Sequence, residues 1–193
     1  LDFVLSADQV RAFKTDATVY VADAAYEVPL STDPHYLTAI RTICRDVTEE
    51  RGVPTVNDKL RVFAVAVHEF GEDGRLVAVS SLDTTLACND KYETCRRLRA
   101  AGVAAAETFL PEALPAGLTY PIFIKPRHGR GSIGAHPVQL ARHLPFFLDL
   151  VTQPVVQTYL DGPEFTIDLF CDRLGEPLSV VPRERVVVRA GVI

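Results

Sequence analysis

The sequence lacks a cluster of basic residues: its 20 lysine and arginine residues are outnumbered by 25 aspartate and glutamate residues. Neutralising a nucleic-acid backbone requires clustered positive charge, so this absence argues against a nucleic-acid partner. Binding of small anionic ligands is still compatible with this composition, because a few local basic residues are enough to bind them.

Long hydrophobic runs are also absent. The longest apolar runs fall well short of the about 20 residues that a membrane-spanning helix needs. The opening stretch LDFVLSADQV has no charged n-region of the kind that begins a signal peptide. We therefore expect a cytoplasmic protein with no membrane partner.

Cysteine is scarce, and methionine does not occur. Four cysteines without a C-x-x-C pair are too few for a disulfide scaffold in a chain of this size, so we expect reduced, buried thiols. The chain begins at Leu1 and ends inside an expected strand, and we therefore expect a fragment whose C-terminal part is missing. The four cysteines are Cys44, Cys88, Cys95 and Cys171.

The first half of the chain alternates strand and helix patterns. With 193 residues and 48% hydrophobic composition, the chain can bury a sizeable core in one large domain or two modest ones. We expect strands within 18–29 and 75–81, a helix from Asp33 as N-cap to Gly52, and a helix within 54–74. This alternation predicts a small parallel α/β domain, although the sequence shows no evident first strand and turn.

The second half has the pattern of an α+β fold. We expect helices within 80–102, capped by Ser81 or Asn89 and ended by Gly102. Pro145 interrupts a later helical pattern, which predicts one broken helix or two short ones. The remaining segments predict an antiparallel sheet, with strands at 121–125, 154–160, 163–172 and 176–189, the last two joined by the turn DRLG (172–175).

In the third of these strands, polar and apolar residues alternate. Glu164, Thr166 and Asp168 share one face, and three apolar residues share the other. We therefore expect the polar face to line a cleft and the apolar face to join a core.

Gly129, Gly131 and Gly134 follow an apolar run with G-x-G-x-x-G spacing. A dinucleotide-binding turn needs its first glycine directly after the strand, whereas four residues separate this run from Gly129. The Walker pattern also fails, because no Lys-Ser or Lys-Thr follows the last glycine. Two interpretations stay open: a lid whose backbone N–H groups line a triphosphate beside Lys125, or a solvent-exposed hairpin tip.

Several stretches together resemble the ATP-grasp superfamily, and in particular the branch of the carbamoyl-phosphate synthase large chain. In chain order they are NDKYETCRRLRAAGV (89–103), YPIFIKPRHGRGSIGA (120–135), VVQTYLDGPEFTIDLFCD (155–172) and PRERVVVRAG (182–191). The resemblance implies an N-terminal Rossmann-like pre-ATP-grasp domain at 1–84, followed by an ATP-grasp module with antiparallel sheets at 85–193. A lid subdomain is expected at about 119–160.

The resemblance also implies which residues bind ATP. Lys91, Lys125 and the glycine loop would hold the phosphates. The segment from Gln157 to Leu160 would meet the adenine, and Glu164 would hold the ribose hydroxyls. Gln157 departs from the family pattern, because many members carry Glu there. The implied ATP-binding residues are Lys91, Lys125, His128, Gly129, Gly131, Ser132, Gly134, Gln157, Tyr159, Leu160 and Glu164.

Three arginines alternate along the last expected strand. Arg185 is our candidate catalytic residue, because a planar guanidinium can hold an acylphosphate or a substrate carboxylate. The alternative is that these arginines solvate an exposed sheet face. The three residues are Arg183, Arg185 and Arg189.

The resemblance implies an ATP-dependent ligase that activates a carboxylic acid as an acylphosphate for attack by an amine or similar nucleophile, forming ADP and phosphate. Mg²⁺ is implied as cofactor, with ligands expected beyond Ile193. Alternatives are a nucleotide-binding or regulatory module without turnover and, more remotely, a dinucleotide-dependent oxidoreductase. A small-molecule substrate is the expected partner, and a homodimer is left open.

Overall fold

The computed structural model describes residues 2–6, 24–48, 50–55, 57–172 and 174–186. The chain divides into two compact units, an N-terminal unit of residues 1–87 and a C-terminal unit of residues 88–193. The fold as a whole is a mixed α/β one that contains antiparallel sheets.

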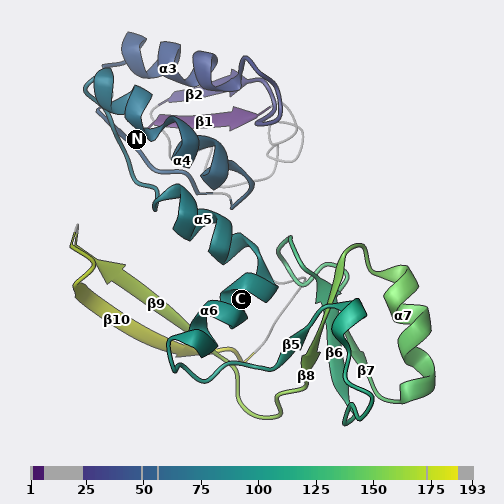
Figure 1. Cartoon of the computed structure of the whole chain (residues 1–193). Coiled ribbons are helices and arrows are strands. Elements are labelled where there is room, and N and C mark those ends of the chain that lie inside the picture. The colour runs from purple at the N-terminus through teal and green to yellow at the C-terminus, as the bar shows by residue number, and fades with distance from the viewer. Residues whose placement is uncertain (1, 7–23, 49, 56, 173, 187–193) are drawn as a thin grey trace. The chain divides into compact units, whose positions relative to one another are not determined.

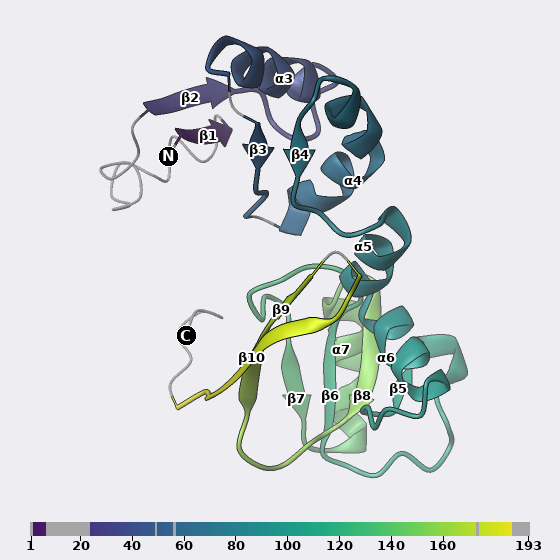
Figure 2. The same ribbon diagram turned by 90° about the vertical axis from the view of Figure 1, so that its left-hand side faces the viewer.

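The N-terminal unit contains two pairs of parallel strands, the first labelled in Figure 1 and both labelled in Figure 2. Strand β1 (Asp2–Ser6) pairs with β2 (Ala24–Val28), and β3 (Arg51–Gly52) pairs with β4 (Leu76–Val77). Strand β1 was not predicted, and residues 18–23 of the predicted strand segment lie outside the described residues. The parallel α/β character predicted from the alternation is present.

Helices α3 (Tyr36–Asp46) and α4 (Asn57–Glu72) supply most of the core of this unit. The ring of Phe63 lies between two other aromatic rings, with its centroid 6.1 Å from that of Tyr36 and 5.8 Å from that of Phe70. Apolar side chains of α3 and α4 thus meet the strands. The buried cluster consists of Val28, Tyr36, Ile40, Phe63, Ala66, Phe70 and Val77.

The predicted boundaries of the first helix were wrong at both ends. The N-cap is His35, and the Asp33 carboxylate instead accepts a hydrogen bond from the His35 backbone N–H at 2.8 Å. Helix α3 ends at Asp46, because Thr48 adopts a left-handed backbone with φ 56° that a helix cannot continue through. Gly52 lies in β3 rather than at a helix end.

The C-terminal unit is built on a four-stranded antiparallel sheet with the strand order β5–β8–β6–β7. Figure 2 shows these four strands side by side in this order. The strands are β5 (Thr108–Phe109), β6 (Ile122–Pro126), β7 (His136–Val138) and β8 (Pro154–Thr158).

Helix α7 (Leu144–Leu150) covers one face of this sheet. Ile122 and Ile124 of β6 point to that face, and neither side chain has any exposed surface. Pro145 lies in the first turn of α7, where its missing N–H costs nothing, and a short 3₁₀ helix at Ala141–His143 directly precedes α7. Of the two predicted alternatives, two short helices are therefore present. The buried cluster here consists of Ile122, Ile124, Val138, Val151 and Val156.

Helices α5 (Leu82–Asn89) and α6 (Lys91–Ala100) precede the sheet. Ser81 accepts a hydrogen bond from the Thr84 backbone N–H near the start of α5, as predicted. The N-cap of α6 is Asp90 rather than Asn89. Gly102 follows α6 with φ 76°, which confirms it as the stop. Two short 3₁₀ turns, η2 (Pro111–Ala113) and η3 (Ala141–His143), complete the unit.

The last described element is an antiparallel hairpin of β9 (Phe165–Cys171) and β10 (Pro177–Glu184). The Asp172 carboxylate closes its predicted turn by accepting hydrogen bonds from the Leu174 and Glu176 backbone N–H groups at 2.8 and 2.9 Å. The apolar face of β9 was expected in a core, but Phe165, Ile167 and Leu169 are all exposed. No described element of the unit covers this apolar face.

All four cysteines are free, which fits the predicted reduced state. Their expected burial was wrong: Cys88 is exposed and the other three are only half-buried. In the described part of the chain, no helix is long and apolar enough to cross a membrane.

Candidate functional site

The face of the sheet opposite α7 carries Lys125. In the antiparallel register, Phe123 pairs with Gln157, and Lys125 pairs with Val155. Since directly opposed residues point to the same side, these four side chains share one face. Cys95 of α6 contacts Gln157, so α6 lies over this face. The sheet therefore places its lysine beneath the helix that begins with Lys91.

Gln157 is a buried polar residue with only 7% of its surface exposed. Its side-chain NH₂ donates to the Thr108 hydroxyl at 2.7 Å and contacts the Cys95 sulfur at 3.2 Å. These contacts hold the amide in one orientation. The two residues expected beside the adenine, Tyr159 and Leu160, follow β8 and are exposed.

Lys91 and Lys125 come from separate elements and influence each other. Burial lowers the pKa of Lys91 below its ordinary value of 10.5, and the positive charge of Lys125 lowers it further. Burial also lowers the pKa of Lys125, while the charges of Cys95 and Glu164 act in the opposite direction. The two ammonium groups therefore lie close enough for their charges to interact unfavourably, and a bound polyanion would offset that repulsion.

The glycine loop between β6 and β7 has a backbone that only certain residues tolerate. Gly129, Gly131, Ser132 and Gly134 have φ values of 109°, 65°, 56° and 69°. At Gly134 a Cβ atom would also lie 3.1 Å from a side-chain carbon of Pro126. The third glycine thus permits close packing of the loop on the end of β6, while Gly129, Gly131 and Ser132 are exposed.

This loop is joined to the start of α6. The Lys91 ammonium donates to the Gly129 carbonyl oxygen at 2.9 Å, and the Lys91 backbone N–H donates to the Arg127 carbonyl oxygen at 3.0 Å. The Nδ1 atom of exposed His128 lies 3.1 Å from the Asn89 carbonyl oxygen. The predicted phosphate residues on α6 and in the loop are thus brought together, although their roles stay predictions.

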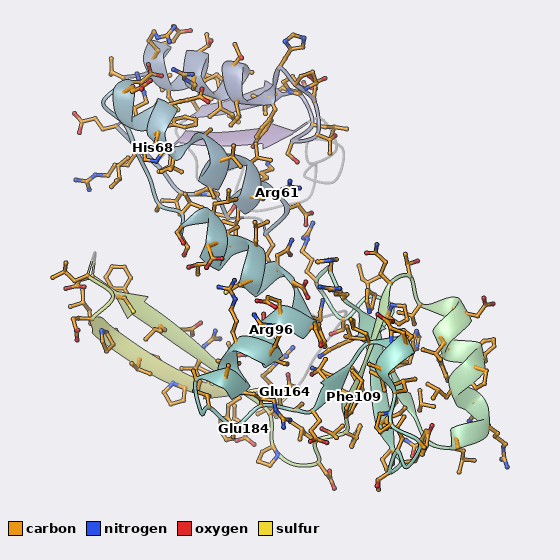
Figure 3. All side chains as sticks on the ribbon, in the orientation of Figure 1. Arg61, His68, Arg96, Phe109, Glu164 and Glu184 are labelled. Atoms are coloured by element: carbon orange, nitrogen blue, oxygen red, sulfur yellow. The ribbon has the colours of Figure 1, made fainter. Side chains whose placement is uncertain are left out.

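Glu164 and Arg185 form an ion pair at the end of the hairpin opposite its turn. Glu164 and Glu184 are labelled at this end in Figure 3. The Nε atom of Arg185 is buried and has no hydrogen-bond partner within the described residues. Arg183 pairs with Asp168 at 2.6 Å and is exposed, as expected for a residue that solvates a sheet face. Arg189 lies outside the described residues.

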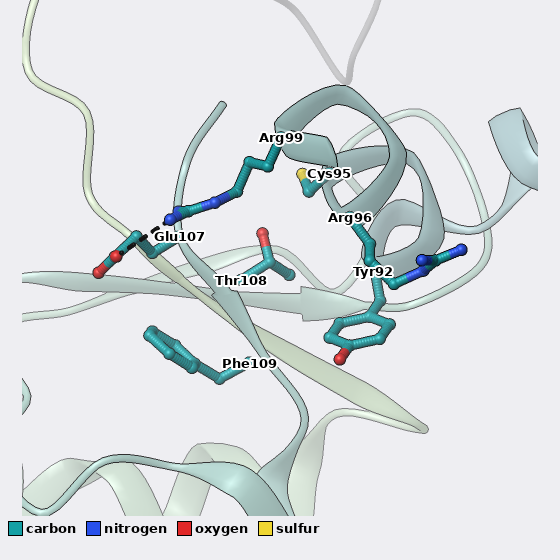
Figure 4. Close-up of a pocket in the computed structure, with 7 residues that line it drawn as sticks. All are labelled: Tyr92, Cys95, Arg96, Arg99, Glu107, Thr108 and Phe109. Atoms are coloured by element: carbon teal, nitrogen blue, oxygen red, sulfur yellow. Dashed lines mark hydrogen bonds and ion pairs between the residues drawn. The ribbon is translucent and has the colours of Figure 1, made fainter. Parts of the chain in front are cut away.

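A separate pocket of about 220 Å³ lies between α6 and β5 (Figure 4). It holds Cys95 and Thr108, the two partners of Gln157, but none of the loop residues. Arg99 reaches Glu107 there at 3.5 Å, and Arg96 pairs with Glu93 at 2.7 Å. The pocket therefore lies beside the Gln157 contacts and apart from the lysines. Its lining is Tyr92, Cys95, Arg96, Arg99, Glu107, Thr108 and Phe109.

Sequence reasoning missed two residues that organise the site, Asp90 and Arg127. Neither residue was assigned a role from the sequence. The available signal was the helix start, because Asp is a strong N-cap residue and here directly precedes the lysine. Within the described ranges, no group of three His, Cys, Asp or Glu residues is placed to hold a metal ion.

The sequence from residue 88 to residue 190, more than half of the chain, matches the family described as ATP-grasp domain. The chain belongs to the ATP-grasp family. The family's sequence match covers α6, the four-stranded sheet and the hairpin, and thus includes the two lysines and the glycine loop described above.

Solved structures show the same ATP-grasp fold at low sequence identity. The chain is similar to the L-amino acid ligase from Bacillus licheniformis, with 21% identity, a TM-score of 0.64, and coverage of 84% of this chain and 40% of that one. It is also similar to the biotin carboxylase of Campylobacter jejuni in a β-γ-ATP complex, with 17% identity and a TM-score of 0.68. That match covers 99% of this chain and 47% of the other. The D-alanine–D-alanine ligase from Bacillus anthracis is 12% identical with a TM-score of 0.54, and the match covers 94% of this chain and 70% of that one.

The ATP-grasp chain spans less than half the length of the first two of these structures. A comparison with curated proteins found no significant match. Because all three structural identities lie below 25%, the likeness describes the fold, and the reaction of this protein is a matter for proposal.

Proposed function

We propose that this ATP-grasp chain binds ATP on the sheet face that carries Lys125, and that the protein is an ADP-forming carboxylate–amine ligase. The observation that carries the proposal is the pairing of Lys91 and Lys125. Two ammonium groups whose pKa values are lowered by burial, and in Lys91 also by its neighbour, are matched to a bound polyanion.

Other residues of the unit fit the remaining parts of the nucleotide. Gln157, held by Thr108 and Cys95, would meet the adenine edge together with the backbone of Tyr159 and Leu160. Glu164 would accept hydrogen bonds from the ribose hydroxyls, since a carboxylate has two acceptor oxygens and Arg185 pairs with one of them. The glycine loop would cover the phosphates with its backbone N–H groups.

The proposed reaction joins a carboxylic acid to an amine or a similar nucleophile. ATP supplies the phosphoryl group that turns the carboxylate into an acylphosphate, and attack by the nucleophile then releases phosphate. In this proposal the Arg185 guanidinium holds the carboxylate or the acylphosphate. The chain's own residues contribute mainly positioning and charge neutralisation.

The proposal also covers the domains, the branch of the family, the substrate class, the metal cofactor, the location and the oligomeric state. Residues 1–84 would form the Rossmann-like pre-ATP-grasp domain, and residues 85–193 would belong to an ATP-grasp module of the carbamoyl-phosphate synthase type. The names of the L-amino acid ligase and the D-alanine–D-alanine ligase support a small carboxylic acid as substrate class. Mg²⁺ would be held by residues outside the groups described here. A cytoplasmic location and a homodimer are likewise proposed.

Nucleotide titration tests the proposal. ATP added with Mg²⁺ at about 100 times its Kd should stabilise the full-length protein by about 2.7 kcal/mol, because a ligand that binds only the folded state shifts the unfolding equilibrium. NAD at the same concentration should give no shift in a thermal-unfolding assay. ATP hydrolysis that depends on an added carboxylic acid would then support the ligase over a module that only binds. Stabilisation by NAD and not by ATP would overturn the proposal.

The affinity for ATP is expected to fall at alkaline pH. Only the ammonium forms of Lys91 and Lys125 neutralise phosphate charge, and the pKa of each is lowered from 10.5. The affinity should therefore begin to fall below pH 10.5, as the two groups lose their protons. Isothermal titration calorimetry at several pH values from about 7 to about 10 measures this fall in affinity.

Lys125→Arg provides the control for this pH profile, because a guanidinium stays charged throughout the titration. The variant should keep more of its affinity at high pH than the parent protein. These two lysines do not themselves destabilise the fold as the pH rises, since the unfolded state binds more protons at them and their contribution to stability rises with pH. An ATP affinity that stays constant over the range would contradict the prediction.

A further inference from the structure

Arg127 is the first residue of the glycine loop, and its side chain contacts Asp90, the N-cap of α6. Its Nε atom lies 3.0 and 2.9 Å from the two carboxylate oxygens of Asp90, and its Nη2 atom lies 2.6 Å from Oδ2. The guanidinium also lies over the ring of Tyr92, 5.5 Å from its centroid. A planar guanidinium held by a forked carboxylate contact and an aromatic ring has little freedom to move.

Asp90 serves the helix and the loop at the same time. Its Oδ1 atom accepts hydrogen bonds from the backbone N–H groups of Tyr92 and Glu93 at 3.0 and 3.1 Å. Its side chain is 13% exposed, against 34% for that of Arg127. Burial would raise the pKa of Asp90, but the hydrogen bonds from Arg127 and Glu93 outweigh it and lower the pKa. The pair therefore differs from an exposed surface ion pair, whose geometry is loose.

Each residue of this pair is a near neighbour in the chain of one lysine of the proposed phosphate site. Lys125 lies two residues before Arg127, whose backbone N–H donates to the Gln153 carbonyl oxygen at 2.8 Å. Lys91 directly follows Asp90, and its ammonium reaches the loop at Gly129. An ammonium has three donors, so this contact leaves two for a ligand. Movement of the Asp90–Arg127 pair would displace the loop relative to both lysines.

We propose that Asp90 and Arg127 are a positioning pair, which fastens the glycine loop to the start of α6 and thereby sets the spacing of Lys91 and Lys125 for a nucleoside triphosphate. This inference rests on the proposed function, because it assumes that the two lysines bind phosphates. It assigns no contact with the nucleotide to either residue. The pair should therefore affect the binding of the phosphate chain and leave the binding of the base unchanged.

Asp90→Asn and Arg127→Gln separate this role from capping. Asn caps a helix about as well as Asp, so Asp90→Asn removes the charge pair and retains the cap. Each variant of the full-length protein should bind ATP about tenfold more weakly, and the double variant should be no weaker than either one, as expected for partners in one interaction. AMP should bind each variant within about twofold of the parent protein, since it lacks the β- and γ-phosphates.

Further variants check that the loss comes from the pair. Arg127→Lys keeps the charge without the forked contact and should bind ATP more tightly than Arg127→Gln but less tightly than the parent. Arg142→Gln removes one positive charge beside α7, on the opposite face of the sheet, and should leave ATP binding unchanged. Hydrogen exchange of residues 127–135 without nucleotide should be faster in Asp90→Asn and unchanged in Arg142→Gln.

The outcomes distinguish this inference from the proposed function. Suppose that the parent protein binds ATP. The positioning role alone would then be overturned if the variants bound ATP equally well, or if they lost affinity for ATP and for AMP to the same extent. Additive losses in the double variant would also overturn it. A folded parent protein that binds no ATP would overturn the proposed function and this inference with it. A tenfold, non-additive loss confined to ATP supports both.

Discussion

Lys125→Ala is expected to weaken ATP binding by about 10- to 100-fold, since a hydrogen bond to a charged group contributes about 1.5–3 kcal/mol. Lys125 is half-buried on the sheet face opposite α7, where the positive charge of Lys91 acts on the same space. Removing Lys125 takes away one of the two cations that the proposed site offers to the phosphates. Isothermal titration calorimetry of the full-length protein with ATP measures the loss.

A matched variant controls for the change in net charge. Arg142→Ala also removes one positive charge from the C-terminal unit, but from the turn that precedes α7, on the far side of the sheet. It should bind ATP as tightly as the parent protein. If Lys125→Ala kept the parent affinity, or if both variants lost affinity equally, Lys125 would not be a phosphate ligand and the ligase proposal would lose its main support.

Ile124→Ala is expected to lower the free energy of unfolding by about 2–5 kcal/mol, the usual cost of truncating a large aliphatic side chain in a packed core. The Ile124 side chain has no exposed surface and packs in the cluster between β6 and α7. Truncation leaves a cavity that the sheet and the helix cannot both close. Chemical denaturation of the full-length protein, followed by circular dichroism, measures the change.

Ile133→Ala is the control for this stability effect, because it makes the same chemical change at a residue that is 79% exposed. A surface substitution of this kind should change stability by no more than about 0.5 kcal/mol. Equal losses in the two variants would show that the α7 face of the sheet is not a packed core. A loss in Ile124→Ala alone supports the assignment of the two sheet faces.

Much of the C-terminal unit could be predicted because its signals are local. Alternation along β6 separates Ile124 from Lys125, and strand geometry alone sends such neighbours to opposite faces. The turn after β9 was predicted from four residues, and Gly102 was predicted to end α6. These features depend on side chains and backbone angles within a few residues of one another, so they can be read without the fold.

The errors have one physical cause in common, which is that local patterns leave several solutions of similar free energy. Asn89 and Asp90 are both good caps, and only the position of Arg127 favours the charged one. Pro145 likewise left one broken helix and two short helices open, and only the structure decided for two short ones. The helical spacing beyond Asp46 was outweighed by the left-handed residue Thr48 and by pairing of β3 with β4.

The apolar face of β9 shows a different limit. Alternation correctly separated Phe165, Ile167 and Leu169 from their polar neighbours, yet all three side chains are exposed. Alternation tells which residues share a face, but it does not tell whether another element lies against that face. The structure is needed for that, because burial depends on what the rest of the chain brings to the strand.

By itself, the sequence determined the ATP-grasp motifs, the strands with their two faces and the glycine-rich loop, because each depends on covalent order and on short-range geometry. The tertiary structure alone decided that Lys91 lies near Lys125 and that Asp90 meets Arg127. Residues far apart in the chain come together only when helix α6 packs over the sheet, and that packing follows from the burial of the whole unit rather than from any short stretch.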